Sequence, residues 1–111
     1  MFEEWLDTDF SELPRVRTVL GRAFSEDSGA NKFGVRVTDN GEPIVLSGTV
    51  RANIIKPDGT TIAQDGSKSQ NKAWVILPSS AYSLNGKISI ALKLINGSEV
   101  ATLGAFEIYV R

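Results

Sequence analysis

The sequence predicts an all-β fold, an antiparallel β-sandwich that follows a short N-terminal amphipathic helix. From Arg15 onward, apolar and polar residues alternate with a period of two, as in strands with one buried face. Turn signals divide this stretch into roughly seven to nine short strands, which is typical of two stacked sheets. The length of 111 residues suits one domain. We therefore predict an arm over residues 1–14 and a β-sandwich over residues 15–111.

The arm is the segment predicted to be helical. Its apolar residues recur at spacings of three and four, so they share one helical face: Phe2, Trp5, Leu6, Phe10 and Leu13. Pro14 ends the helix, because proline forces extended geometry on the residue before it. A helix this short needs a surface to pack on. That surface is either the chain's own sandwich or a neighbouring subunit, and in the second case these five residues form an interface.

The strands are read from alternation. Phe33, Val35 and Val37 alternate with polar residues over 32–39, and Ile88, Ile90 and Leu92 do so over 87–95. The same reasoning predicts strands over 16–24, 43–46, 49–56, 60–63, 73–77, 100–103 and 106–110. The run 73–77 is wholly apolar, so we expect a central strand covered on both faces, with Trp74 in the core.

The connections are read from turn residues. Asn40-Gly41 and Asn96-Gly97 predict type I′ hairpin turns, because both residue types tolerate a positive φ. Pro57-Asp58-Gly59 predicts a further turn. Residues 64–71 predict a polar loop, residues 78–84 a connection with one helical turn, and Gly104 a β-bulge.

The composition excludes the commonest catalytic sites. The chain has no histidine and no cysteine, which rules out Ser-His-Asp and Cys-His triads, thiolate zinc sites and disulfides. Asp39, Asp58 and Asp65 stand in turn and loop sequences, where aspartate supports backbone geometry. The glycines lack the spacing of a phosphate-binding loop. We predict that the chain is not an enzyme and has no catalytic residue, metal or cofactor.

Charge and hydropathy argue against nucleic-acid and membrane partners. Five of the 13 acidic residues lie in the first fourteen positions, so the rest of the chain is only mildly basic. No apolar run approaches the roughly 18 residues of a membrane span. The acidic N-terminus lacks the basic start of a signal peptide, so no secretion is predicted. The last residues still alternate as a strand, which is compatible with a longer protein.

Two segments carry a resemblance to a known family. Residues 30–48 read ANKFGVRVTDNGEPIVLSG, and residues 50–59 read VRANIIKPDG. This order of a strand, a D-N-G-x-P turn, L-x-G, an alternating strand and a K-P-D-G turn resembles the N-terminal immunoglobulin-like domain of the phage baseplate upper protein family (BppU). WVILP at 74–78 and LNGKI at 84–88 fit the later strands of that family. The resemblance covers residues 15–111, and the arm lies outside it.

The resemblance implies an immunoglobulin-like sandwich and a structural protein of a tailed-phage virion, in a baseplate, another adsorption appendage, a head fibre or a capsid decoration. It implies that the partners are other virion proteins (baseplate, fibre or capsid) and further copies of the chain. It also implies a location in the virion after synthesis in the bacterial host cytoplasm. The alternative is a carbohydrate- or receptor-binding sandwich, which would gather exposed aromatic residues on loops. Here Phe and Trp concentrate in the arm and the strands.

Overall fold

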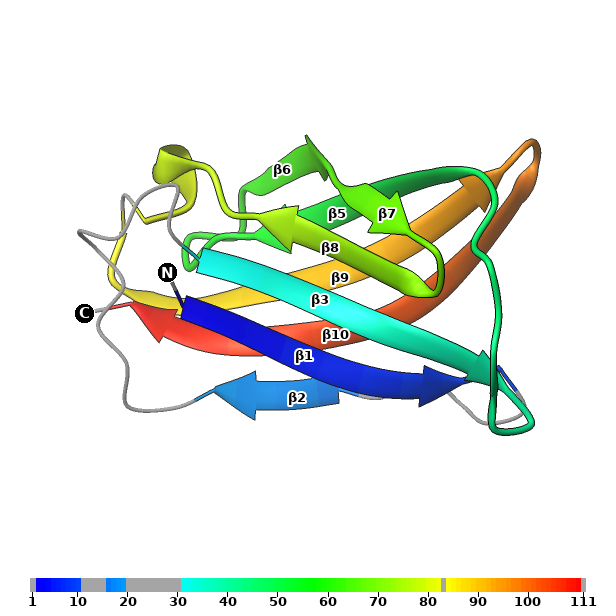
Figure 1. The fold of residues 1–111 in the computed structure, drawn as a ribbon. Helices are drawn as coiled ribbons and strands as arrows, with labels where there is room; N and C mark the ends of the chain where they lie inside the picture. Colours follow the sequence, from blue (N-terminus) through cyan, green and yellow to red (C-terminus); the bar gives the residue numbers. More distant parts are fainter. Residues whose placement is uncertain (1, 11–15, 20–30, 83, 111) are drawn as a thin grey trace.

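Two β-sheets pack face to face in the computed structural model, which describes residues 2–10, 16–19, 31–82 and 84–110 (Figure 1). Sheet A has the strand order β1-β3-β8-β7, with β4 paired to β3, and sheet B has the order β2-β10-β9-β5-β6. The elements are β1 (Phe2–Asp9), β2 (Val16–Val19), β3 (Asn31–Asp39), β4 (Glu42–Pro43), β5 (Thr49–Ile55), β6 (Thr61–Asp65), β7 (Ser67–Ser69), β8 (Lys72–Ile76), the 3₁₀ helix η1 (Ser79–Tyr82), β9 (Gly86–Asn96) and β10 (Glu99–Val110).

The core lies between the sheets and is filled by the residues that alternation predicts. In sheet A, β3 turns Phe33, Val35 and Val37 inward, and each is fully buried. The rings of Phe33 and Phe106 meet across the interior with their centroids 5.4 Å apart. Burying a large apolar side chain contributes about 1.5–3 kcal/mol, so these alternating positions hold the sheets together. The predicted all-β sandwich of two sheets is confirmed.

The helix predicted for the arm is wrong, because residues 2–9 form strand β1 of sheet A. β1 pairs in parallel with β3, with Leu6 opposite Val35. Alternation along the strand places Leu6 and Thr8 in the interior, at 3% and 4% exposure, while Trp5 lies on the other face. Pairing with the edge of β3 gives the backbone groups of this segment hydrogen-bond partners. A helix this short would be only marginally stable by itself. The boundary predicted at residue 14 lies outside the described residues.

The sequence predicted an antiparallel sandwich, but two of the strand pairs are parallel. β1 pairs in parallel with β3 and β2 in parallel with β10, whereas the other strand pairs are antiparallel. The first two strands lie on the same side of the sandwich, one in each sheet (Figure 1). The strand predicted over 16–24 is confirmed for Val16–Val19, and its remainder lies outside the described residues.

The segment 64–71, predicted to be a loop, contains the end of β6 and all of β7. The chain passes from sheet B to sheet A at Gly66, between these two strands. All three residues of β7 are exposed, so β7 has no buried face. Because an edge strand of this kind shows no apolar alternation, its sequence resembles that of a loop.

Of the two predicted type I′ hairpin turns, the one at Asn40-Gly41 is confirmed and the one at Asn96-Gly97 is wrong. Asn40 and Gly41 have φ values of 51° and 84°, as a type I′ turn requires. In the second hairpin the turn is shifted by one residue, because Asn96 pairs with Glu99 and the central residues are Gly97 and Ser98. Gly97, with a φ of 64°, holds the first central position, whereas Ser98 at the second has no positive φ. This is the pattern of a type II′ turn, in which glycine takes the first central position. The bulge predicted at Gly104 is confirmed by a register shift between Thr102 and Gly104.

The core position predicted for Trp74 is wrong. Its neighbours Ala73 and Val75 point inward and are buried, so alternation directs Trp74 to the outer face of sheet A. β8 is an inner strand of its sheet but is not covered on both faces, since Ile76 is 38% exposed. An apolar run alone does not reveal which face of a sheet is solvated.

Among the described residues, no helix has the length and apolar character needed to span a lipid bilayer.

Candidate interaction surface

The two tryptophans of the chain meet on the outer face of sheet A. Gly34 of β3 is paired with Trp5 of β1 on one side and with Trp74 of β8 on the other. The ring centroids are 6.2 Å apart and the ring planes cross at 64°, an edge-to-face contact. A Cβ at Gly34 would lie less than 3.0 Å from atoms of the Trp5 ring. Glycine at this position therefore allows the two rings to meet across β3.

Three cationic side chains surround the rings. The Nζ of Lys32 lies 5.2 Å from the centroid of Trp74. The Cζ of Arg36 and the Nζ of Lys72 lie 5.6 Å and 5.9 Å from Trp5. At a solvated site each such cation–π contact contributes about 0.5–1 kcal/mol. We call Trp5, Trp74, Lys32, Arg36 and Lys72 the tryptophan patch.

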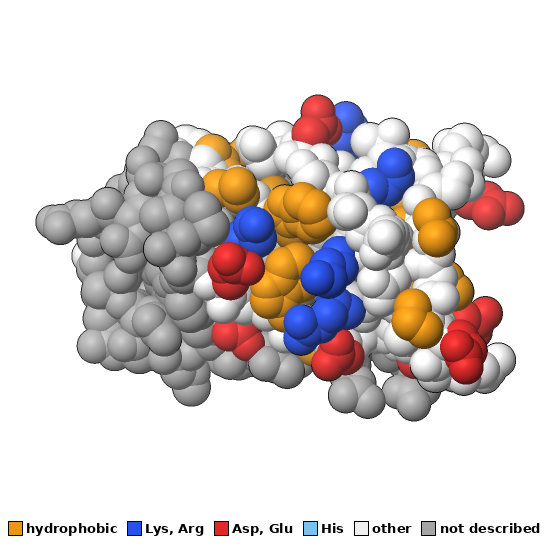
Figure 2. Space-filling view, viewed as in Figure 1, with side chains coloured by type: hydrophobic (Ala, Val, Ile, Leu, Met, Phe, Trp, Pro, Cys, Tyr) orange, Lys and Arg blue, Asp and Glu red, His pale blue; other side chains and the backbone are white. Residues whose placement is uncertain are grey.

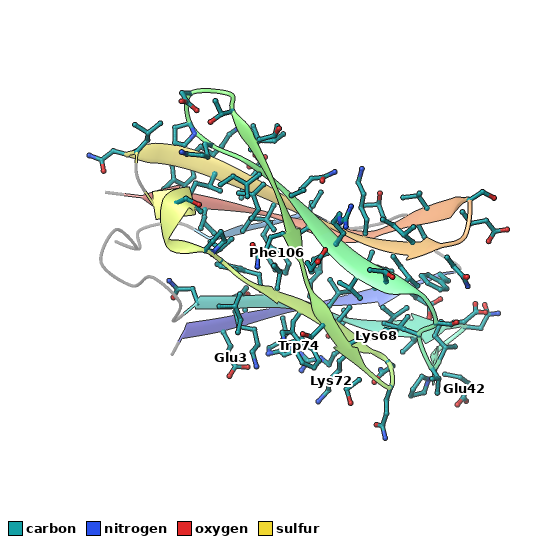
Figure 3. The ribbon with its side chains drawn as sticks, turned by 90° about the horizontal axis from the view of Figure 1, so that it is seen from above. Glu3, Glu42, Lys68, Lys72, Trp74 and Phe106 are labelled. Atoms are coloured by element: carbon teal, nitrogen blue, oxygen red, sulfur yellow. The ribbon has the colours of Figure 1, made fainter. Side chains whose placement is uncertain are left out.

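The patch faces solvent on one side of the molecule. Figure 2 shows apolar side chains at the centre of this face with Lys and Arg side chains around them. Figure 3, seen from above, shows Trp74, Lys72 and Glu3 on the outer side of sheet A, while Phe106 lies between the sheets. Both tryptophans are half-buried, so part of each indole remains available for contact.

Two carboxylates fix parts of the patch. The Nε of Arg36 lies 3.0 Å from Oδ1 of Asp7, and the Nε1 of Trp5 donates a hydrogen bond of 3.0 Å to Oε1 of Glu3. The ion pair is exposed and so contributes little stability, at most about 1 kcal/mol. Among the described residues, Lys32 and Lys72 form no ion pair, which leaves the patch with an excess of positive charge.

The structure does not gather the five predicted interface residues on one surface. Trp5 belongs to the tryptophan patch, whereas Leu6 is in the core and has almost no surface left for a partner. Phe10 is 42% exposed and lines a shallow hollow with Leu94 and Val100. The side chain of Phe2 and all of Leu13 lie outside the described residues.

The remaining patch residues were missed by the sequence prediction. The signal for Lys32 and Arg36 was present, since alternation places both on the outer face of the strand at 32–39. Trp74 had no such signal, because the run 73–77 is wholly apolar and shows no alternation. The meeting of Trp74 with Trp5 depends on the pairing of β1 with β3, which the helical interpretation of the arm concealed.

Several described aspartates take part in turns and ion pairs. Asp58 accepts hydrogen bonds from Oγ1 and the backbone nitrogen of Thr60, at 2.6 Å and 3.0 Å, and these bonds lower the pKa of Asp58. Asp9 accepts hydrogen bonds from the backbone of Asn40 and Gly41, and Asp65 pairs with Arg51. Within the described residues, no group of three or more acidic side chains could hold a metal ion.

Fold and surface together define a small two-sheet β-sandwich domain with an aromatic, basic outer face. No protein-family model matches the chain, and no curated protein matches its sequence. Among solved structures, the chain is similar to the N-terminal domain of phage TP901-1 ORF48, the baseplate upper protein BppU. The TM-score is 0.55 at 11% sequence identity, over 100% of this chain and 99% of that domain. At this identity the likeness concerns the fold, and at that level it confirms the resemblance to BppU inferred from the sequence.

Proposed function

We propose that the chain is a structural module of a tailed-phage virion, which self-assembles and anchors an adsorption component. The observation that carries this proposal is the full-length fold likeness to the N-terminal domain of ORF48, a baseplate protein. In this proposal the sandwich is of the immunoglobulin-like kind. The module belongs to a baseplate, a head fibre or a capsid decoration, and it is made in the bacterial host cytoplasm before it joins the virion.

The proposed mechanism is protein–protein packing without catalysis, and without a nucleic-acid or membrane partner. Tryptophan and arginine are the side chains most enriched among residues that dominate binding energy at interfaces. The tryptophan patch supplies both, on strands that hold them in place. Because Trp5 is already fixed by Glu3 and by the ring of Trp74, little conformational entropy remains to be lost on binding. Of the interface predicted from the sequence, the proposal keeps Trp5 and adds Trp74.

A binding experiment tests the proposal. The purified chain is immobilised and exposed to the individually purified structural proteins of the same virion. We expect at least one of them to bind, and Trp74→Ala to weaken that binding by about 30-fold, which corresponds to the ~2 kcal/mol of an interface anchor. Val45→Ala is the matched control, because Val45 is 80% exposed and lies outside the patch.

Two results would count against the proposal. If no virion protein is retained by the intact chain, the anchoring role is wrong. If a partner binds but Trp74→Ala and Val45→Ala bind it equally well, the tryptophan patch is not the contact surface. The thermal unfolding of both variants is recorded alongside, so that a folding defect is not mistaken for a binding defect.

The second candidate is a carbohydrate- or receptor-binding sandwich, and the half-buried tryptophan pair is the observation that favours it. Sugar rings pack their C–H faces on aromatic side chains in binding sites lined by such residues. Against it, Lys32, Arg36 and Lys72 already lie within 5.9 Å of the ring centroids. Titration with neutral and acidic oligosaccharides, followed by tryptophan fluorescence, separates the candidates, because saturable quenching by a glycan would favour this second one.

A further inference from the structure

We propose that β6 is a self-association strand, which pairs in antiparallel fashion with β6 of a second copy and joins two copies of sheet B into one continuous sheet. This inference rests on the proposed function, because it names the contact through which the module assembles with itself. β6 is the last strand of sheet B and lies at the upper margin of the sandwich (Figure 1).

The first argument concerns the backbone groups of β6. The nitrogen of Lys56 donates to the carbonyl of Thr60, and that of Gly66 donates to the carbonyl of Val50, at 2.8 Å and 2.9 Å. Hydrogen-bonded pairs alternate along an antiparallel ladder, so Ile62 and Gln64 bond to β5 in between. The N–H and C=O groups of Thr61, Ala63 and Asp65 therefore point away from the sheet. No strand among the described residues pairs with them.

The second argument is the absence of edge protection. Natural edge strands avoid pairing with other chains by carrying lysine, proline, other charges or a bulge, or by being very short. β1 is strongly acidic, β4 contains Pro43, and β7 has only three residues, one of them Lys68. By contrast, β6 reads TIAQD and its only charge, on Asp65, lies 3.2 Å from Arg51 of the neighbouring β5.

The third argument is that the edge is complementary to itself. An antiparallel pairing with its two-fold axis at Ala63 places Thr61 opposite Asp65 of the second copy and Ala63 opposite its own equivalent. All three facing pairs are then of the hydrogen-bonded kind, which gives roughly six backbone hydrogen bonds. No like charges face each other, and the small Ala63 leaves room at the axis.

The proposed pairing is tested by substituting Ala63, the residue at the two-fold axis. Ala63 is exposed, so a longer side chain is tolerated in the monomer, but in the pair each residue 63 faces its copy. Ala63→Lys and Ala63→Glu each set like charges opposite one another, and an equimolar mixture of the two variants restores opposite charges. Sedimentation equilibrium measures the mass in solution. We expect the intact chain to have twice the monomer mass of 12.0 kDa, and each variant alone to have the monomer mass. The equimolar mixture is expected to have twice the monomer mass again.

Ala101→Lys is the matched control, because Ala101 is an exposed alanine in β10, away from β6. It is expected to keep the doubled mass. The inference is overturned if the intact chain is monomeric, if Ala63→Lys alone keeps the doubled mass, or if the mixture remains monomeric. These outcomes are independent of whether the chain is found in virions, so a failure of the β6 contact is distinguishable from a failure of the proposed function.

Discussion

The hydroxyl of Thr8 in β1 donates a hydrogen bond of 2.7 Å to the carbonyl of Leu103 in β10, through the buried space between the two sheets. Leu103 stands at the bulge between Thr102 and Gly104, where the ladder with β9 is interrupted. The bond thus joins a polar residue of sheet A to a backbone group that the bulge of sheet B leaves without its regular partner. It ties the first strand of the chain to the last.

Thr8→Val tests this connection. Valine keeps the volume of threonine and removes the donor, which leaves the Leu103 carbonyl buried without this partner. We expect the free energy of unfolding to fall by about 1–3 kcal/mol. Urea unfolding followed by circular dichroism measures it. Thr102→Val, at an exposed position beside the same bulge, is the control and should change the free energy by less than about 0.5 kcal/mol. Equal stabilities of the two variants would contradict the role of the bond.

Asp9 stabilises the turn at Asn40-Gly41. Its carboxylate accepts hydrogen bonds from Oγ1 of Thr38 and from the backbone nitrogens of Asn40 and Gly41, at 2.8, 3.0 and 2.7 Å. We expect Asp9→Ala to lower the free energy of unfolding by about 1–3 kcal/mol and to speed hydrogen exchange at the Asn40 and Gly41 amides.

Asp39→Ala is the matched control for Asp9, since Asp39 is an exposed aspartate of the same hairpin. Its substitution should leave the two turn amides as protected as in the intact chain. Unchanged exchange at Asn40 and Gly41 in the Asp9 variant would show that the carboxylate does not hold the turn.

Gly34→Ala tests the geometry of the tryptophan patch. The added methyl group overlaps the ring of Trp5, so we expect Trp5 to move outward and the free energy of unfolding to fall by about 1–3 kcal/mol. In a Trp74→Phe background the emission comes from Trp5 alone, and it should shift to longer wavelength. When Trp5 is first replaced by alanine, Gly34→Ala should cost less than about 0.5 kcal/mol, because the overlap is gone. An equal cost in both backgrounds would contradict this prediction.

The pKa of Asp58 depends on Thr60. The hydrogen bonds from the Thr60 hydroxyl and backbone nitrogen lower this pKa from its ordinary value of 3.8. A carboxyl whose pKa is lowered on folding stabilises the fold above pH 3.8, and this contribution is lost as the pH falls through the lowered pKa. Thr60→Val removes the hydroxyl and should raise the pKa of Asp58 towards 3.8, as an NMR titration of its carboxyl can measure. Thr61→Val should leave it unchanged, and a Thr60 variant without a rise would refute the assignment.

The fold was predictable where local pattern and tertiary environment agree. Phe33, Val35 and Val37 alternate because one face of β3 meets the core, and Asn40-Gly41 forms its turn through residues adjacent in sequence. β1 was not predictable in the same way. Its inward Thr8 is polar and finds its partner 95 residues away, so the sequence lacks the apolar alternation of a strand.

The interaction surface was only partly predictable, because it also depends on contacts between residues far apart in the sequence. The outward positions of Lys32 and Arg36 follow from local alternation, and the sequence analysis had already proposed Trp5 as an interface residue. Its contact with Trp74 arises from two strand pairings with β3, one of them parallel and between segments far apart in the chain. Local periodicity carries no information about such pairings, whereas the register of a sheet determines them.

The presence of the chain in virus particles tests the central claim most directly. Virions purified from the phage that encodes the chain are analysed by quantitative mass spectrometry, and antibodies to the chain carrying gold particles locate it by electron microscopy. We predict a constant number of copies per particle and labelling at one fixed position, on the baseplate, on the head or on a fibre. Particles that lack the chain, or that carry it only in traces removed by further purification, would contradict the claim that it is a structural module of the virion.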